Sequence, residues 1–105
     1  MTKTELLNAL ARHQGREHGI SAQRLAALLA VPQRRLRKLV SELREEGIAI
    51  CGTPATGYYM AVTPEELQET CAFLEHRALH SLRKLSQMKK VSLPTLLGQL
   101  MLNQA

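Results

Sequence analysis

Aromatic side chains are scarce in this sequence of 105 residues, which contains two Tyr, one Phe and no Trp. Surfaces that hold single-stranded nucleic acid without sequence preference stack successive bases on aromatic side chains. The shortage of aromatic residues therefore argues against a surface of that kind. If the partner is a nucleic acid, a duplex is favoured over a single strand.

The sequence also lacks long apolar runs and has few cysteines. Cys51 and Cys71 lie in segments with strand-like and helix-like patterns, and nothing indicates a disulfide framework. We expect both to be small apolar side chains that are buried or half-buried. No run approaches the length that spans a membrane, and the N-terminus has no apolar segment like that of a signal peptide. We therefore expect a cytoplasmic protein that does not enter a membrane.

Motifs of catalysis and cofactor binding are missing as well. There is no Gly-rich phosphate loop, nucleophile elbow, carboxylate dyad or Cys-x-x-Cys pair. His76 and His80 are four residues apart and near Glu75, a geometry that can hold a transition metal. Two ligands without a third do not make a site, and solvated imidazoles on a polar helix face are the preferred explanation. We expect no enzymatic activity, no cofactor and no metal.

Negative charge is in short supply, because 14 Lys and Arg face nine acidic residues and the net charge is +5. Residues 1–63 contain nine Lys and Arg against five Glu, whereas residues 64–105 contain five against four. A basic bias favours a polyanion such as nucleic acid or an anionic membrane surface. The positive excess lies in the first of these two segments.

Residues 32–47 predict a short helix with two opposed faces. Its apolar residues follow the i, i+3, i+4, i+7 spacing of one helix face; they are Leu36, Leu39, Val40 and Leu43. The other face contains Arg34, Arg35, Arg37, Lys38 and Ser41. Pro32 suits the first turn and Gly47 the position just past the end. A basic helix face is usually only solvated, so the surrounding sequence has to decide its role.

Two more helices are expected before this one. Residues 2–13 place Leu6, Leu7, Leu10 and Ala11 on one face. Ser21 suits the N-cap of a second helix over Ala22–Ala30, with Leu25, Leu28 and Leu29 as its core face. Only Ala30 and Val31 separate the second helix from the third, so the two must cross steeply. This is the pattern of a helix-turn-helix.

After Gly47 the apolar period changes from near 3.6 to two. Ile48–Cys51 and Tyr58–Val62 flank the turn residues Gly52–Gly57, which predicts a β-hairpin. We expect its inward side chains to be Ile48, Ile50, Tyr58 and Met60. The expected fold class is mainly α with a small β-hairpin (α+β), with a winged helix-turn-helix domain over 1–63 and a helical extension over 64–105.

The run from Ile20 to Ile48, closed by Gly57-Tyr-Tyr-Met60, resembles winged helix-turn-helix DNA-binding domains. It is similar to the N-terminal domain of biotin operon repressors and to small phage or plasmid DNA-binding proteins, over about residues 4–62. The resemblance implies that the third helix enters the major groove and that the hairpin, or wing, lies along the backbone or minor groove. The groove-facing residues that it implies are Gln33, Arg34, Arg35, Arg37 and Lys38.

Ser41 lies on the same face, and the wing could offer phosphate only Thr53, Thr56 or backbone N–H groups. Three positions depart from the family pattern. Ala30 stands where the turn usually has Gly, and Pro32 stands where Ser or Thr usually caps the third helix. The wing from Gly52 to Gly57 contains no Lys or Arg, which bears on its contribution to DNA binding.

Residues 63–90 predict a long helix that begins at a capping box, Thr63-Pro-Glu-Glu66, with Glu early and Lys and Arg late. Its apolar stripe consists of Leu67, Cys71, Leu74, Ala78, Leu82 and Leu85. A helix of this kind must pack on something. It either folds back on its own domain or forms a two-fold homodimer, and we favour the homodimer because the N-terminal core is small.

Residues 92–103 predict a short terminal helix capped by Ser92. Its apolar face consists of Leu93, Leu96, Leu97, Leu100 and Met101. We prefer packing on the long helix of the same or a neighbouring chain. A docking segment for a protein partner at residues 91–105 is the alternative.

Two functions follow from these patterns. The first is a DNA-binding protein, either a transcriptional regulator or a phage or plasmid replication-associated factor, that reads double-stranded DNA through its third helix. The alternative is a winged-helix protein-interaction module without specific DNA binding, because fold alone does not settle function. The basic third helix favours the first hypothesis and the uncharged wing favours the second.

Overall fold

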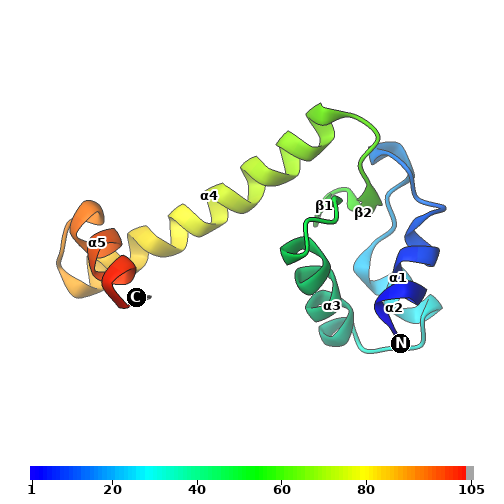
Figure 1. Cartoon of the computed structure of the whole chain (residues 1–105), viewed down its shortest axis with the longest axis horizontal. Helices are drawn as coiled ribbons and strands as arrows, with labels where there is room; N and C mark the ends of the chain where they lie inside the picture. The colour runs from blue at the N-terminus through cyan, green and yellow to red at the C-terminus, as the bar shows by residue number, and fades with distance from the viewer. Residues whose placement is uncertain (104–105) are drawn as a thin grey trace. The chain divides into compact units, whose positions relative to one another are not determined.

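The chain forms two compact units in a computed structural model that describes residues 1–103 (Figure 1). The N-terminal unit is Met1–Cys71, and the C-terminal unit begins at Ala72. The elements are α1 (Lys3–Leu10), the 3-10 helix η1 (Arg16–His18), α2 (Ala22–Leu28), α3 (Gln33–Glu45), β1 (Ile50–Thr53), β2 (Gly57–Met60), α4 (Pro64–Lys89) and α5 (Leu93–Asn103). This order confirms the α+β fold class, with a helix-turn-helix, a hairpin, a long helix and a short terminal helix.

The core of the N-terminal unit lies behind α3, whose predicted apolar face is confirmed. Leu36, Leu39, Val40 and Leu43 are at most 3% exposed. They pack in one cluster with buried side chains from α1 and α2, among them Leu6, Leu10 and Leu25. Burial of one such side chain contributes about 1.5–3 kcal/mol. With its apolar face held in this way, α3 turns its charged face outward.

The first two helices are shorter than predicted, and α2 differs in part from the prediction in which residues it buries. Leu28 was assigned to the core face of α2 but is 72% exposed, whereas Ala26 is buried. The reason is geometric: Leu25 and Ala26 point toward the cluster, and Leu28, three residues after Leu25, falls at the edge of that face. The predicted caps include Ser21, whose Oγ accepts a hydrogen bond from the Arg24 N–H at 3.2 Å, which confirms its role.

The turn between α2 and α3 contains a residue with a positive φ. Ala30 has φ +55°, in the left-handed region that glycine adopts more readily. The N–H groups of Ala30 and Val31 donate to the carbonyls of Ala27 and Ala26 at 3.2 and 3.0 Å, so the end of α2 is closed as in a Schellman motif. The turn therefore forms with Ala where the family pattern has Gly, at the cost of some local strain.

The hairpin is buried on both faces, whereas the sequence predicted only one. β1 and β2 are antiparallel, with Ile50 opposite Met60 and Cys51 opposite Tyr59. Ile48, Ile50, Tyr58 and Met60 pack on the helical core as predicted. The prediction missed the other face, where Cys51 and Tyr59 are at most 1% exposed.

The first turns of α4 lie over this second face. The Thr70 side chain is buried, and its Oγ1 accepts a hydrogen bond from the Gly52 N–H at 3.1 Å. Burial raises the pKa values of the Cys51 thiol and the Tyr59 hydroxyl, because desolvation disfavours their charged forms. The predicted domain boundary fell at residue 63, but α4 contributes to the N-terminal unit as far as Cys71.

The segment between α1 and α2 also pairs with the hairpin, although its composition indicated a simple loop. The Ile20 N–H donates to the Tyr58 carbonyl at 2.9 Å, and the Tyr58 N–H donates back to Ile20 at 2.7 Å. The Gly15 N–H donates to the Met60 carbonyl at 2.8 Å. These backbone bonds supply the partners that the free edge of β2 would otherwise need.

The C-terminal unit consists of the remainder of α4 and α5. α4 ends at a left-handed residue, Lys90 with φ +56°, after which Ser92 caps α5 and accepts from the Thr95 N–H at 3.3 Å. Leu96 is fully buried, whereas Leu97 and Met101, which were predicted on the same apolar face, are 41% and 71% exposed. In the described chain no helix combines the length and the apolar character that crossing a bilayer requires.

Candidate nucleic-acid interface

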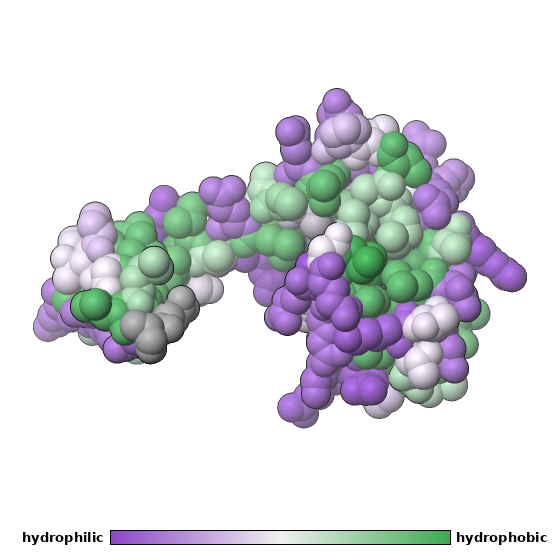
Figure 2. All heavy atoms as spheres, viewed as in Figure 1, coloured by the Kyte–Doolittle hydropathy of each residue, from purple (hydrophilic) through white to green (hydrophobic). Residues whose placement is uncertain are grey.

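The outer face of α3 presents all six residues that the sequence assigned to it. They are Gln33, Arg34, Arg35, Arg37, Lys38 and Ser41, and every one is exposed. Figure 2 shows hydrophilic surface over α3 on the face in view. Arg37 Nη2 donates to the Gln33 side-chain oxygen at 3.3 Å. Within residues 1–103, none of the four cations on this face forms an ion pair.

The order of charges along α3 opposes its own macrodipole. The first half contains the four cations, with Arg34 and Arg35 and no acidic residue in the first turn, and the last turn has Arg44 beside Glu45 and the cap Glu46. A helix favours acidic side chains at its N-terminus and basic ones at its C-terminus, by about 0.3–1 kcal/mol for each charge in an end turn. This order therefore costs local stability. Helix formation does not explain it, but an anionic partner at the N-terminal half would.

The N-terminus of α3 adds to this attraction for anions. Pro32 is the N-cap and, having no hydroxyl or carboxylate, makes no side-chain capping bond, as its position in the sequence predicted. The first N–H groups of a helix point along its axis and carry partial positive charge. A phosphate can supply the missing acceptor, and this is a common arrangement at helix N-termini. Local geometry and side-chain charge thus favour the same kind of ligand.

Three other cations of the N-terminal unit have partners within the fold, whereas Arg12 and Arg24 form no ion pair among the described residues. Lys3 Nζ lies 3.2 Å from Glu46, and Arg16 Nη1 lies 3.2 Å from Glu69. Arg44 donates from Nε to the Ile50 carbonyl at 2.7 Å, and its guanidinium lies over the Tyr58 ring, 6.0 Å from the centroid. Arg44 thereby ties the end of α3 to the hairpin. These contacts separate structural cations from those on the outer face of α3.

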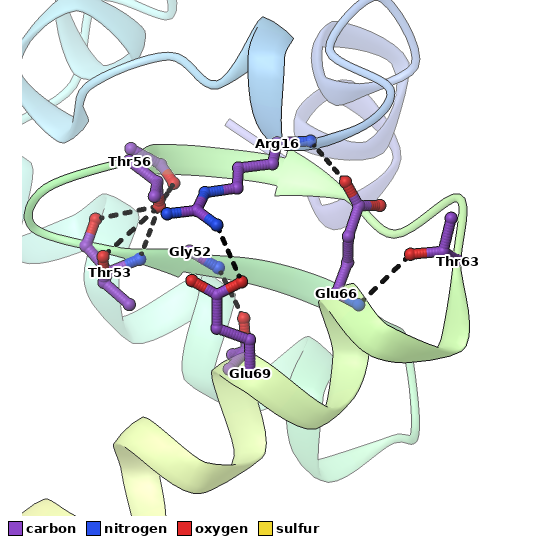
Figure 3. A network of polar contacts seen from close by, with 9 residues as sticks. Arg16, Gly52, Thr53, Thr56, Thr63, Glu66 and Glu69 are labelled. Carbon is purple, nitrogen blue, oxygen red and sulfur yellow. Dashed lines mark hydrogen bonds and ion pairs between the residues drawn. The ribbon is translucent and has the colours of Figure 1, made fainter.

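The two wing threonines predicted to contact DNA use their hydroxyls within the turn (Figure 3). Thr56 Oγ1 accepts from the Thr53 N–H at 3.0 Å and lies 3.0 Å from the Gly57 carbonyl, to which it can donate. The two hydroxyls are 3.4 Å apart. The tip between them consists of Pro54 and Ala55, both exposed. The wing therefore offers an uncharged, rigid tip.

A polar network that the sequence analysis missed fixes the wing and α4 to the N-terminal segment (Figure 3). The Glu66 carboxylate accepts from the Arg16 N–H at 2.7 Å and from the Val62 N–H at 2.8 Å. The capping box therefore forms only in part: Thr63 accepts from the Glu66 N–H, but Glu66 reaches Val62 instead of returning to Thr63. The Val62 and Arg16 bonds lower the pKa of Glu66 below its ordinary value. A capping-box pattern alone could not reveal the Arg16 partner, which is 50 residues away.

The predicted dimerisation stripe on α4 is open over much of its length. Leu67 and Leu74 are 42% and 37% exposed, and Cys71 and Ala78 are exposed as well. Exposure of Cys71 corrects the expectation that both cysteines are buried or half-buried. Leu82 and Leu85 are half-buried. Figure 2 shows apolar surface on the visible face of the C-terminal unit.

His76 and His80, the pair that the sequence singled out for metal binding, both lie on the exposed surface of α4. The described residues contain no group of three or more His, Cys, Asp or Glu side chains placed to hold a metal ion. The candidate interface is therefore defined by cations, amides and hydroxyls.

Comparison with known proteins bears on the N-terminal half. The sequence model of one family, Replication protein A C terminal, matches residues 1–50, which span α1 to α3 and the start of β1. No curated protein and no solved structure matches the chain. The match gives no direct support to a relationship with biotin operon repressors in particular. Over residues 1–50 the chain is similar to a winged-helix-like domain family associated with replication.

Proposed function

We propose that this protein binds double-stranded DNA and reads it through α3. The observation that carries the proposal is the exposed face of α3, where four cations without ion pairs in the described chain gather in the first half of the helix and Arg34 and Arg35 oppose the dipole in its first turn. The second helix of a helix-turn-helix enters the major groove with its N-terminal residues at the bases. In this protein Gln33 is the first residue of that helix. The proposal does not involve enzymatic activity.

The side chains divide between two roles. Arg can pair with the O6 and N7 atoms of guanine and Gln with the N6 and N7 atoms of adenine. We assign Gln33 and Arg37, which contact each other at 3.3 Å, to base recognition, because that contact orders both side chains beforehand. We assign Arg34, Arg35 and Lys38 mainly to phosphates, and Ser41 to a further phosphate.

The biological setting is inferred from the family match and the resemblance of the sequence. A replication-associated factor, including one of a phage or plasmid, is supported by the similarity of residues 1–50 to the replication protein family. A transcriptional regulator is the other setting for a small winged helix-turn-helix protein. For either role we propose a cytoplasmic location.

The first test is a titration of the full chain against random duplex DNA and against a pool of genomic fragments at two salt concentrations. We expect selective retention of fragments that share a site, with affinity that falls as salt rises because phosphate contacts release counterions. Salt-sensitive binding without any preference would contradict base recognition by α3. No binding at low salt would overturn the proposal.

The role of α3 is tested by replacing Arg34, Arg35 and Lys38 with Ala together. Each lost phosphate contact should lower the slope of log affinity against log salt by about 0.9, so we expect a fall of about 2.7 for three contacts. Thermal stability should stay unchanged or rise slightly, because these cations oppose the dipole. Arg12→Ala, which removes an exposed cation from the turn after α1, is the control and should leave the slope nearly unchanged.

A homodimer through the apolar stripe of α4 extends the proposal. Two copies would present two α3 helices to half-sites separated by about 34 Å or a multiple of it. Cys71 reports on this interface, because it is an exposed thiol within the stripe. We expect its reaction with a thiol reagent to slow as protein concentration rises, whereas Cys51, which is buried, reacts only on unfolding. Leu74→Glu should abolish the concentration dependence and halve the mass in solution.

A protein-interaction module is the second candidate, and a specific observation favours it. Leu28 is 72% exposed on α2 and lines an open depression with Arg24 and Ala27. An exposed large apolar side chain beside a cation suits a protein contact more than a DNA contact. Leu28→Ser separates the candidates: unchanged DNA affinity together with loss of a bound protein would favour the module.

A further inference from the structure

The two units differ in net charge when the boundary between them is placed after Cys71, as in the structure. Residues 1–71 contain nine Lys and Arg and eight Glu, a net charge of +1. From residue 72 onward there are five Lys and Arg and one Glu, a net charge of +4. The three Glu that open α4 belong to the N-terminal unit, where Glu66 and Glu69 contact Arg16. Most of the positive excess of this protein therefore lies on its C-terminal unit.

Within that unit the charge is concentrated on one face of α4. The side chains of this basic stripe fall within about 120° of one another at 100° per residue, so they share a helix face; they are His76, Arg77, His80, Arg83 and Lys84. All five are exposed. The stripe is about 12 Å long at 1.5 Å per residue. It lies on the side of the helix opposite Cys71 and Ala78, so a dimer through the apolar stripe would leave it open.

Helix stability explains only part of this charge. Lys89 and Lys90 follow the dipole at the C-terminal end of α4, but the effect falls off within the last turn, and Arg77, Arg83 and Lys84 lie before it. Acidic partners do not explain the rest, since the described part of the C-terminal unit forms no ion pair and α5 has no charged residue. Arg77 packs over the Phe73 ring, 5.8 Å from its centroid, which orders that guanidinium at the surface.

We propose that the basic stripe on α4 is a second DNA-contacting surface, which binds the phosphate backbone of a duplex without reading its sequence. The inference rests on the proposed function, because it concerns the same DNA that α3 would read. A duplex displays one negative charge per about 1.7 Å of its axis with both strands counted, so a 12 Å length carries about seven, and the stripe faces those on its own side. The stripe lacks the long amide side chains that read adenine, and we assign its Arg and Lys side chains to phosphates. It increases affinity and contributes no base preference.

The test compares two double variants of the full chain that remove the same charge, one from within α4 and one from its last residue and the residue after it. Arg83→Gln/Lys84→Gln removes two cations from the stripe, and Lys89→Gln/Lys90→Gln removes two from outside it. The exposed positions should leave helicity by circular dichroism unchanged in both. Binding is measured by fluorescence anisotropy on a random duplex and on a selected site over a range of salt concentrations.

We expect the stripe variant to lower the salt slope by about 1.8, that is 0.9 for each of two phosphate contacts, and to weaken both duplexes by the same factor. The control should change the slope by much less. Equal slopes for the stripe variant and the wild type, with DNA binding retained, would overturn the stripe while leaving α3 as the reader. Loss of slope from the stripe variant, with none from the α3 variant, would keep the stripe and overturn reading by α3.

Discussion

The N-terminal and C-terminal units handle charge and apolar surface differently. In the N-terminal unit Lys3, Arg16 and Arg44 have acidic, carbonyl or aromatic partners, and both faces of the hairpin are covered. In the described C-terminal unit no cation forms an ion pair, and Met88, Met101 and Leu102 are 71–82% exposed. The N-terminal unit pairs several of its cations within the fold and leaves those of α3 exposed. The exposed apolar and cationic side chains of the C-terminal unit indicate a surface for partners.

Substitutions at two glycines, one in each unit, test the difference between the units with the largest expected effects. Gly57 has φ +76°, and an added Cβ would lie 2.6 Å from the Ile20 carbonyl. We expect Gly57→Ala to lower the free energy of unfolding by about 3 kcal/mol, because the side chain strains the backbone and separates the hairpin from Ile20. Gly98 lies within α5, and a Cβ there meets no atom within 4 Å. Gly98→Ala should therefore stabilise its helix by about 1 kcal/mol.

Both variants are measured by urea unfolding followed by circular dichroism and by the fluorescence of the two Tyr residues, which lie in the hairpin. The Gly57 variant should shift the fluorescence transition to lower urea. The Gly98 variant should move only the helical signal, and to higher urea. Equal effects of the two substitutions would mean that the units do not differ in how tightly their backbones are packed.

In the turn between α2 and α3 we expect a smaller change in the free energy of unfolding, opposite in sign to that of Gly57→Ala. Ala30 holds a positive φ, which costs an L-residue roughly 1–2 kcal/mol. We expect Ala30→Gly to raise the free energy of unfolding by about 1 kcal/mol, because glycine adopts that region without strain. Ala27→Gly, at an exposed helical position in α2, should lower it by about 1 kcal/mol. A loss of stability in both variants would contradict the strained turn.

The smallest expected effect concerns Glu66, which joins the N-terminal segment to α4. Its pKa in the folded protein is lowered from the ordinary value of 4.5, chiefly by the Val62 and Arg16 N–H bonds. The contribution of its carboxylate to stability is therefore present above pH 4.5 and is lost as the pH falls through the lower, folded pKa. Glu66→Gln should be less stable than the wild type at neutral pH, with the difference closing in acid.

Thermal unfolding at pH 7 and in steps below pH 4.5 would measure this difference. Glu65→Gln is the matched control, because Glu65 is exposed on the same turn and makes no hydrogen bond among the described residues. A wild-type advantage that grew in acid would contradict the bonds assigned to the carboxylate.

Much of the helix-turn-helix could be predicted because its information is local. The i, i+3, i+4, i+7 spacing of α3 identified all four buried residues and the exposed basic face. The cap at Ser21 and the missing cap at Pro32 could also be predicted from the sequence, because each depends on neighbouring backbone groups. α2 was the exception. It is only seven residues long, so its periodicity could not separate Leu28 from Leu25.

The candidate interface was predictable in part for the same reason. The cations of α3 follow from the helix face, but the engaged hydroxyls of Thr53 and Thr56 depend on how the turn folds. The residues of the basic stripe on α4 can be read from the sequence. The net charge of their unit follows only from the structure, because Glu66 and Glu69 contact Arg16 and belong to the N-terminal unit. Charge counts by segment are reliable only after the domain boundary is known.

The sequence by itself determined the elements, the outward charge of α3 and its opposition to the dipole, because these depend on spacing within one helix. Tertiary structure alone decided that the start of α4 seals the hairpin, burying Cys51 and Tyr59 and leaving Cys71 exposed. The difference is one of distance along the chain. Periodicity reports which face is apolar, but the segment that covers that face is fixed by contacts between residues far apart in sequence, such as the bond from Gly52 to Thr70.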